Sequence, residues 1–124
     1  MKKLTKQDIH NLVMEIAGNS LKNEGYEFLT VNSKLEKDPQ FVSTKNKQLH
    51  FIIVRAIEYP ENPVKYDCHF MSNIFFHAIK FKARTHYAGV GLAKANEFNK
   101  EIVYDSSYAI NFNGLQEIIL NEKI

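Results

Sequence analysis

QFVSTKNKQLHFIIVRA, residues 40–56, is the stretch of sequence that decides the fold. Two apolar runs flank the polar turn at residues 45–47, which is the pattern of two neighbouring strands. The second run, residues 49–57, is nearly unbroken in apolar and β-branched residues, as expected of a strand that is buried on both faces. Arg55 interrupts this run, and a buried guanidinium is costly without a partner. We therefore expect Arg55 either to emerge at the strand end or to meet a carboxylate.

The flanking sequence predicts alternating helices and strands. Thr5 and Asp8 are spaced as a capping box ahead of apolar residues at helical spacing, so we expect a helix from there to about residue 23. Further expected elements are a strand at 26–32, a helix capped by Asp67, a strand at 84–92, a hairpin of 101–104 and 108–113, and a helical turn at 115–120. The order α-β-β-β-α-β-β predicts one α/β (α+β) domain, residues 1–124, with a mixed central sheet flanked by helices.

Composition argues against several classes of protein. The formal net charge of +2 is too small to indicate strong electrostatic capture of nucleic acid or of an acidic membrane. Cys68 is the single cysteine, which excludes an internal disulfide and a four-cysteine metal site and fits a reducing compartment. No run approaches the roughly 20 apolar residues of a membrane helix, and the basic N-terminus lacks the apolar segment of a signal peptide. We expect a cytoplasmic protein without membrane insertion.

The element order and the central strand pair resemble the restriction-endonuclease-like, or PD-(D/E)XK, superfamily. In that superfamily an acid at the entry to the second strand and a (D/E)-x-K triplet on the third strand meet around a magnesium ion. Matched residue by residue, Asp38-Pro39 stands at the first place in reversed order, and Ile53-Val54-Arg55 stands at the second place without its acid. The resemblance therefore implies a nuclease-like scaffold with a degenerate active site.

The missing acid bears directly on catalysis. Magnesium prefers carboxylate oxygens, and a guanidinium stays protonated, so Arg55 is a poor general base. We therefore predict no catalytic residue, no bound metal and no cofactor. The alternative is a divergent magnesium-dependent nuclease, in which Asp38 and Arg55 would be joined by Glu15, Glu27 or Glu24.

Three segments carry a second resemblance: YEFLTVNS at residues 26–33, LHFIIVRA at 49–56 and HYAGVGLAKA at 86–95. They are similar to a group of short Bacteroidetes proteins that bear the name of the flavin- and iron–sulfur-containing component of the sodium-translocating NADH:quinone reductase. This resemblance implies an accessory protein associated with that complex. Cys68 alone cannot hold the four-cysteine iron–sulfur cluster of the genuine component.

Two further features are candidates for a cofactor-binding or a metal-binding site. Gly89-Val90-Gly91 lacks the third small residue and the later acid of a dinucleotide fingerprint, so it indicates a bulge or a close backbone approach. The histidines match no metal-binding spacing and are predicted to be surface residues or hydrogen-bonded structural residues, with a metal site as the alternative. They are His10, His50, His69, His77 and His86.

Basic residues gather at the expected start of two strands. Lys80, Lys82 and Arg84 follow the second helix, and Lys45 and Lys47 flank the central turn. Together they could form a positive rim for a phosphate backbone. The alternative is that the lysines complement the helix dipole, and the small net charge favours it.

The predicted C-terminal hairpin offers a second surface. Tyr104, Tyr108 and Phe112 could line a homodimer contact through an exposed sheet edge. Taken together, the residues predict a non-catalytic binding or interaction module. A metal-dependent nuclease and a reductase-associated accessory protein are the alternatives.

Overall fold

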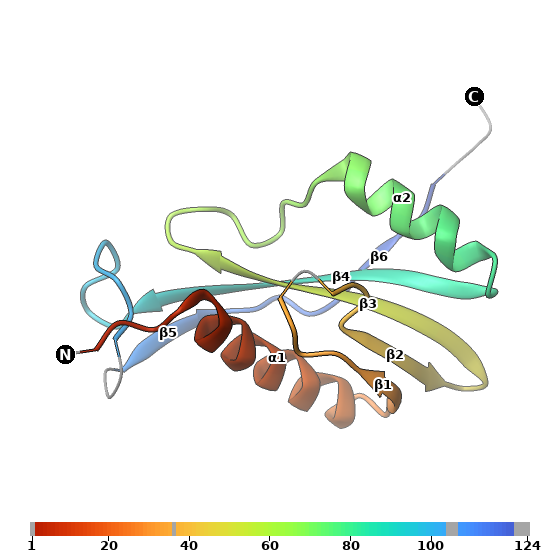
Figure 1. Ribbon diagram of the computed structural model, residues 1–124, viewed down its shortest axis with the longest axis horizontal. Helices are drawn as coiled ribbons and strands as arrows, with labels where there is room; N and C mark the ends of the chain where they lie inside the picture. The colour runs from red at the N-terminus through yellow and green to blue at the C-terminus, as the bar shows by residue number, and fades with distance from the viewer. Residues whose placement is uncertain (1, 36, 104–106, 121–124) are drawn as a thin grey trace.

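Two helices cover opposite faces of a six-stranded mixed sheet in the computed structural model, which describes residues 2–35, 37–103 and 107–120 (Figure 1). The elements are α1 (Lys6–Asn23), β1 (Glu27–Val31), β2 (Phe41–Lys45), β3 (Gln48–Glu58), α2 (Cys68–Ile79), β4 (Ala83–Lys94), β5 (Tyr108–Asn111) and β6 (Gln116–Ile118). The predicted α/β class with a mixed, helix-flanked sheet is confirmed, and the elements through β4 follow in the predicted order.

The sheet combines an antiparallel meander with one parallel crossover. Strands β1, β2 and β3 pair antiparallel in sequence, and α2 carries the chain across to β4, which lies parallel to β3. In the parallel pair Leu49 lies beside Ala83 and Glu58 lies beside Leu92. Strands β3 and β4 therefore begin at one end of the sheet and finish at the other, which defines the two ends of the molecule.

Local sequence signals account for the turn and the helix starts. Asn46 and Lys47 have φ angles of 53° and 65°, the positive values that a two-residue hairpin of type I′ requires. Thr5 Oγ1 accepts from the backbone N–H of Asp8, whose carboxylate accepts in return from the N–H of Thr5, so the capping box is confirmed. Asp67 caps α2 in the predicted place by accepting from the N–H of Phe70.

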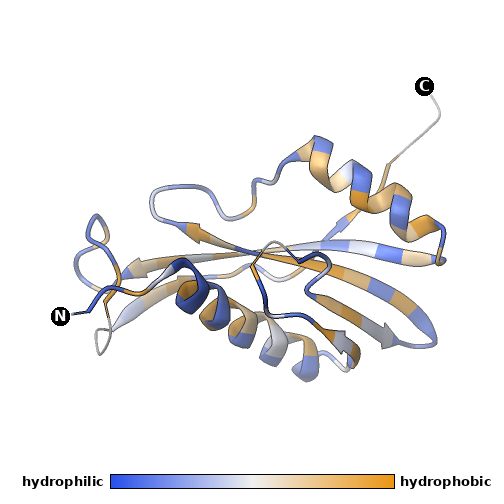
Figure 2. Ribbon diagram, in the orientation of Figure 1, coloured by the Kyte–Doolittle hydropathy of each residue, from blue (hydrophilic) through white to orange (hydrophobic). Residues whose placement is uncertain are grey.

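The sheet buries a core on each face, and β3 contributes to both. Ile52 and Val54 pack with Val13, Ala17 and Leu21 of α1 on one face. On the other face Ile53 packs with Met71 of α2, Tyr87 and Ile118. The apolar stripe of α1 and the nearly continuous apolar run of β3 are visible in Figure 2. The prediction that this strand is buried on both faces is confirmed.

The C-terminal prediction was wrong in its details. Residues 115–120 do not form a helical turn, because residues 116–118 form β6 against β4. The predicted hairpin is absent from the described residues: β5 also pairs with β4, Val103 makes a single bridge to Lys3, and Tyr104 lies outside the described residues. The reason is the length of β4, whose free edge offers backbone partners to both short strands.

The glycines of β4 serve packing. A Cβ on Gly89 would lie 2.0 Å from the carbonyl oxygen of Pro63, and one on Gly91 would lie 3.2 Å from Cγ of Pro63. Both glycines lie within β4, which runs on to Lys94, so no helix opens at them as a dinucleotide site would need. The loop before α2 therefore crosses this strand closely, which is the close backbone approach, one of the two predicted alternatives.

Candidate functional site

The predicted basic residues do come together, at the end of the sheet where β3 and β4 begin. Lys45 and Lys47 lie at the β2–β3 turn, and Lys80, Lys82 and Arg84 lie at the passage from α2 into β4. We call these five residues the basic rim. The side-chain amide of Gln48 donates to the carbonyl oxygen of Lys82 at 2.9 Å and ties the two connections together.

The charges of the basic rim are largely free. Lys47, Lys80 and Lys82 are exposed and make no ion pair with the described carboxylates. Lys45 Nζ lies 4.9 Å from the centroid of the Tyr26 ring. Arg84 lies 3.6 Å from Glu117, and its side chain remains 58% exposed. The rim therefore presents cations to the outside, as an anion-binding surface requires.

Exposed apolar side chains border the basic rim. Phe81, between Lys80 and Lys82, is 55% exposed, and Phe76 and Ile79 on the outer side of α2 are nearly as exposed. The Phe81 ring meets His77 at 5.3 Å and Phe51 at 5.7 Å, which holds it in place. Cations and rings on one surface can contact both the phosphates and the bases of a nucleic acid.

Just inside the basic rim, two buried histidines form a hydrogen-bonded pair. His50 Nδ1 lies 2.8 Å from His86 Nε2, so one ring donates and the other accepts. Burial and then Arg84 lower the pKa of His50, and burial, His50 and Arg84 lower the pKa of His86 to about 4. Both rings are therefore neutral at neutral pH. His69 and His77, by contrast, are exposed on α2.

A second polar cluster joins Asp38 and Arg55, the two charged residues that the sequence comparison matched to the nuclease motif. Asp38 and Arg55 form a two-pronged ion pair, with Oδ1 to Nη1 at 2.9 Å and Oδ2 to Nη2 at 3.0 Å. Gln40, which is fully buried, donates to Asp38 and accepts from Arg55 and from the backbone N–H of Val54. Arg55 thus meets a carboxylate, which was one of the two predicted outcomes.

Electrostatics fix this cluster in its charged form. Burial would raise the pKa of Asp38, but hydrogen bonds from Arg55 and Gln40 outweigh burial and hold that pKa below its ordinary value. His10 of α1 is buried nearby, and burial followed by the charge of Arg55 lowers its pKa. The carboxylate of Asp38 is therefore ionised, and it is bound by the side chains of Arg55 and Gln40.

The remaining nuclease candidates are not gathered around Asp38. Ile53, at the position of the missing acid, is fully buried in the core beneath α2. Glu27 is exposed on β1, and Glu15 is exposed on α1 beside a separate hollow that also includes Phe41. Within residues 2–35, 37–103 and 107–120, no group of three or more His, Cys, Asp or Glu side chains is placed to hold a metal ion.

Sequence reasoning missed Gln40. This residue directly precedes β2. Its backbone N–H donates to the carbonyl oxygen of Ile52, and its side-chain oxygen accepts from the backbone N–H of Val54, which lies beyond the part of β3 that pairs with β2. A polar glutamine directly before the apolar residues Phe41 and Val42 was the available sequence signal, and the structure buries it fully. Phe112, one of the residues predicted at a dimer contact, packs partly buried against the core beneath α1.

Comparison with known proteins places the whole fold in one family. A family model described as domain of unknown function DUF8840 matches residues 7–118, which run from the start of α1 to the end of β6. The chain belongs to this family. No curated protein matches the chain. In the described part of the DUF8840 chain, neither helix is long and apolar enough to cross a membrane.

Proposed function

We propose that this protein is a non-catalytic binding module on a nuclease-like scaffold and that the basic rim binds the phosphate backbone of a nucleic acid. The observation that carries the proposal is the convergence of five cations from two separate connections at one end of the parallel strand pair. Their charges are mostly unpaired and are bordered by exposed rings, which supports contact with a polyanion.

The Asp38–Arg55 ion pair supports the non-catalytic part of the proposal. A magnesium ion would have to displace the guanidinium of Arg55 from the carboxylate of Asp38, and the fully buried Ile53 offers no oxygen ligand beside it. In place of a metal site, the two positions form an internal ion pair that stabilises the fold.

Salt-dependent binding tests the proposal. Binding of labelled single-stranded and duplex DNA and RNA is measured by fluorescence anisotropy across a range of salt concentrations. We expect Lys82→Glu with Arg84→Glu to weaken binding about tenfold or more at low salt, and to reduce the slope of log affinity against log salt by about 0.7–0.9 per lost phosphate contact.

A matched control separates the basic rim from total charge. Lys34→Glu with Lys65→Glu makes the same change in net charge at exposed lysines away from the rim. Equal weakening by both double variants, or no measurable binding by the parent protein, would refute a rim-directed function. Circular dichroism of each variant checks that the fold is retained.

The two alternatives make different predictions. A divergent nuclease would bind magnesium or manganese in calorimetry and cleave DNA or RNA, and Asp38→Ala would abolish both. A reductase-associated accessory protein would copurify with the components of that membrane complex and would have no affinity for nucleic acid.

Two further parts of the proposal concern location and assembly. Cys68 is exposed and free, which supports a reducing, cytoplasmic setting. Tyr108 and Ile110 are 40% and 50% exposed on β5, the last strand in the order of the sheet, which supports a homodimer contact through that edge. Sedimentation at increasing concentration tests the dimer.

A further inference from the structure

Two adjoining cavities lie at the end of the molecule opposite the basic rim, where β3 and β4 finish. Their volumes are about 260 Å³ and 320 Å³. Both are lined by Tyr59, Phe98, Leu92 and Ala93. Clefts at the carboxyl ends of parallel strands are common ligand sites, because loops from neighbouring strands enclose them. This position is independent of the proposed nucleic-acid surface.

One aromatic pair lines both cavities. The ring centroids of Tyr59 and Phe98 lie 5.3 Å apart with the planes inclined at 56°. Both side chains are about half exposed, at 50% and 48%, so each has ring surface open to a ligand. The backbone N–H of Tyr59 donates to the carbonyl oxygen of Leu92, which anchors one side of the pair to β4.

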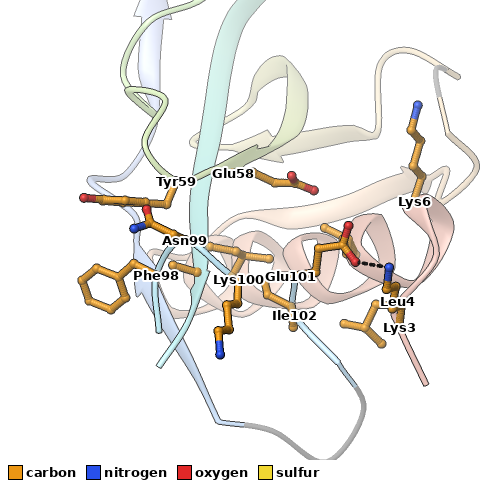
Figure 3. Close-up of a pocket in the computed structure, with 13 residues that line it drawn as sticks. Lys3, Leu4, Lys6, Glu58, Tyr59, Phe98, Asn99, Lys100, Glu101 and Ile102 are labelled. Carbon is orange, nitrogen blue, oxygen red and sulfur yellow. Dashed lines mark ion pairs between the residues drawn. The ribbon is translucent and has the colours of Figure 1, made fainter. Parts of the chain in front are cut away.

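Ion pairs cancel most of the charges around the cavities. Lys3 Nζ lies 2.8 Å from Glu101, and Lys100 Nζ lies 2.6 Å from Glu97. Figure 3 shows the Lys3–Glu101 pair to one side of Glu58, with Tyr59 and Asn99 on the other. The amino groups of Lys6 and Lys100 point toward opposite margins of that view, away from Glu58.

The two cavities differ in the charges that remain unpaired. In the smaller one Glu58 has no ion-pair partner among the described residues, but neither has Lys6, so its lining offers both signs. In the larger one Glu61 is the sole charged residue of the described lining, and it has no ion-pair partner there. The rest of that lining is largely apolar and includes Ile57, Pro63 and Ile110. A lone carboxylate beside exposed rings and apolar side chains favours a cation that carries an apolar body.

The geometry points to a binding site in the larger cavity for a small organic ammonium ion with an aromatic or aliphatic body, held between Glu61, Tyr59 and Phe98. The ammonium group pairs with the Glu61 carboxylate and lies against a ring face, and the apolar body covers the apolar lining of the cavity. A carboxylate of the same shape is repelled by Glu61, and a neutral alcohol gains only the apolar contact.

The test is a titration of the full ¹⁵N-labelled chain with 2-phenylethylamine, followed by amide chemical shifts. We expect saturable shifts confined to residues 57–64, 91–94, 97–99 and 108–111. The neutral analogue 2-phenylethanol should bind about three to ten times more weakly, and 3-phenylpropionate should not bind measurably. Shifts without saturation, or binding of 3-phenylpropionate as tight as that of the amine, would overturn the assignment.

Variants locate the site. Glu61→Gln should weaken 2-phenylethylamine about three- to tenfold, and Phe98→Leu should weaken it without altering the fold, because the Phe98 ring is half exposed. Glu27→Gln removes one exposed carboxylate elsewhere and should change nothing. Equal losses in the two glutamine variants would show that the amine responds to net charge, which contradicts a built site.

Discussion

Strand β3 carries two polar groups that solve the problem of burial in different ways. At its start His50 pairs with His86, and the two rings share one hydrogen bond while both stay neutral. Toward its end Arg55 carries a permanent charge, and Asp38 and Gln40 compensate it with three contacts. Beside the histidine pair, two buried atoms have no hydrogen-bond partner among the described atoms: Nδ1 of His86 and the hydroxyl of the neighbouring Ser43.

This difference teaches how each group responds to perturbation. A histidine can lose its proton and become neutral when it is buried. Burial therefore lowers the free energy of unfolding only at acidic pH, where the ring is protonated. A guanidinium stays protonated when it is buried. The free energy of unfolding therefore falls when the paired carboxylate is removed by mutation. The first group should be sensitive to pH and the second to mutation.

The largest effect should come from breaking the charged pair. Asp38→Ala leaves the partly buried Arg55 without its carboxylate, and we expect the free energy of unfolding to fall by about 2–3 kcal/mol. Urea denaturation followed by circular dichroism measures this loss.

The double variant Asp38→Ala with Arg55→Met serves as its control. It removes both charges while an apolar chain still covers Phe70, which now lies 5.3 Å from the Arg55 guanidinium. We expect it to recover at least half of the loss. A double variant no more stable than Asp38→Ala would show that the unpaired charge is not the cause.

A smaller effect should come from acidifying the histidine pair. The folded pKa of His86, about 4, lies below its ordinary value of 6.5, so the unfolded chain binds the proton first as the pH falls. The stabilising contribution is complete above pH 6.5 and declines as the pH falls toward 4. Between about pH 7.5 and about pH 5 we expect His86 alone to cost about 2 kcal/mol of unfolding free energy.

Two measurements check the origin of this pH dependence. Urea denaturation at each pH gives the slope, and His86→Asn should flatten it. Proton NMR of the histidine rings reports the titration directly, and the His86 ring should stay neutral to well below pH 6. A His86 ring that titrates with an ordinary pKa would remove the contrast with Arg55.

The smallest effect concerns Ser43, the cross-strand neighbour of His50. Its buried hydroxyl has no partner among the described atoms, so Ser43→Ala should change the unfolding free energy by less than about 0.5 kcal/mol. Gln40→Leu provides the contrast at a buried polar residue with partners, and should cost about 1–3 kcal/mol because the Val54 N–H loses its acceptor. Similar losses of unfolding free energy in Ser43→Ala and Gln40→Leu would show that hydrogen-bond partners do not determine the effect of these substitutions.

Short-range patterns in the sequence determined most of the local structure. The capping box at Thr5, the cap at Asp67 and the turn at Asn46-Lys47 act within a few residues of the chain, and the apolar run of β3 implies burial on both faces. These features depend on backbone geometry and side-chain periodicity, which the sequence displays directly. The order of elements as far as β4 followed from them.

Only the tertiary structure decided which distant groups meet. The sequence left open whether Arg55 emerges or meets a carboxylate and could not select Asp38. Nor could it pair His50 with His86, or set Glu61 in a cavity beside the Tyr59–Phe98 rings. It also could not foresee that β5 and β6 both pair with the long β4. Such choices depend on distances across the folded sheet, where many pairings satisfy the same local rules and packing selects one of them.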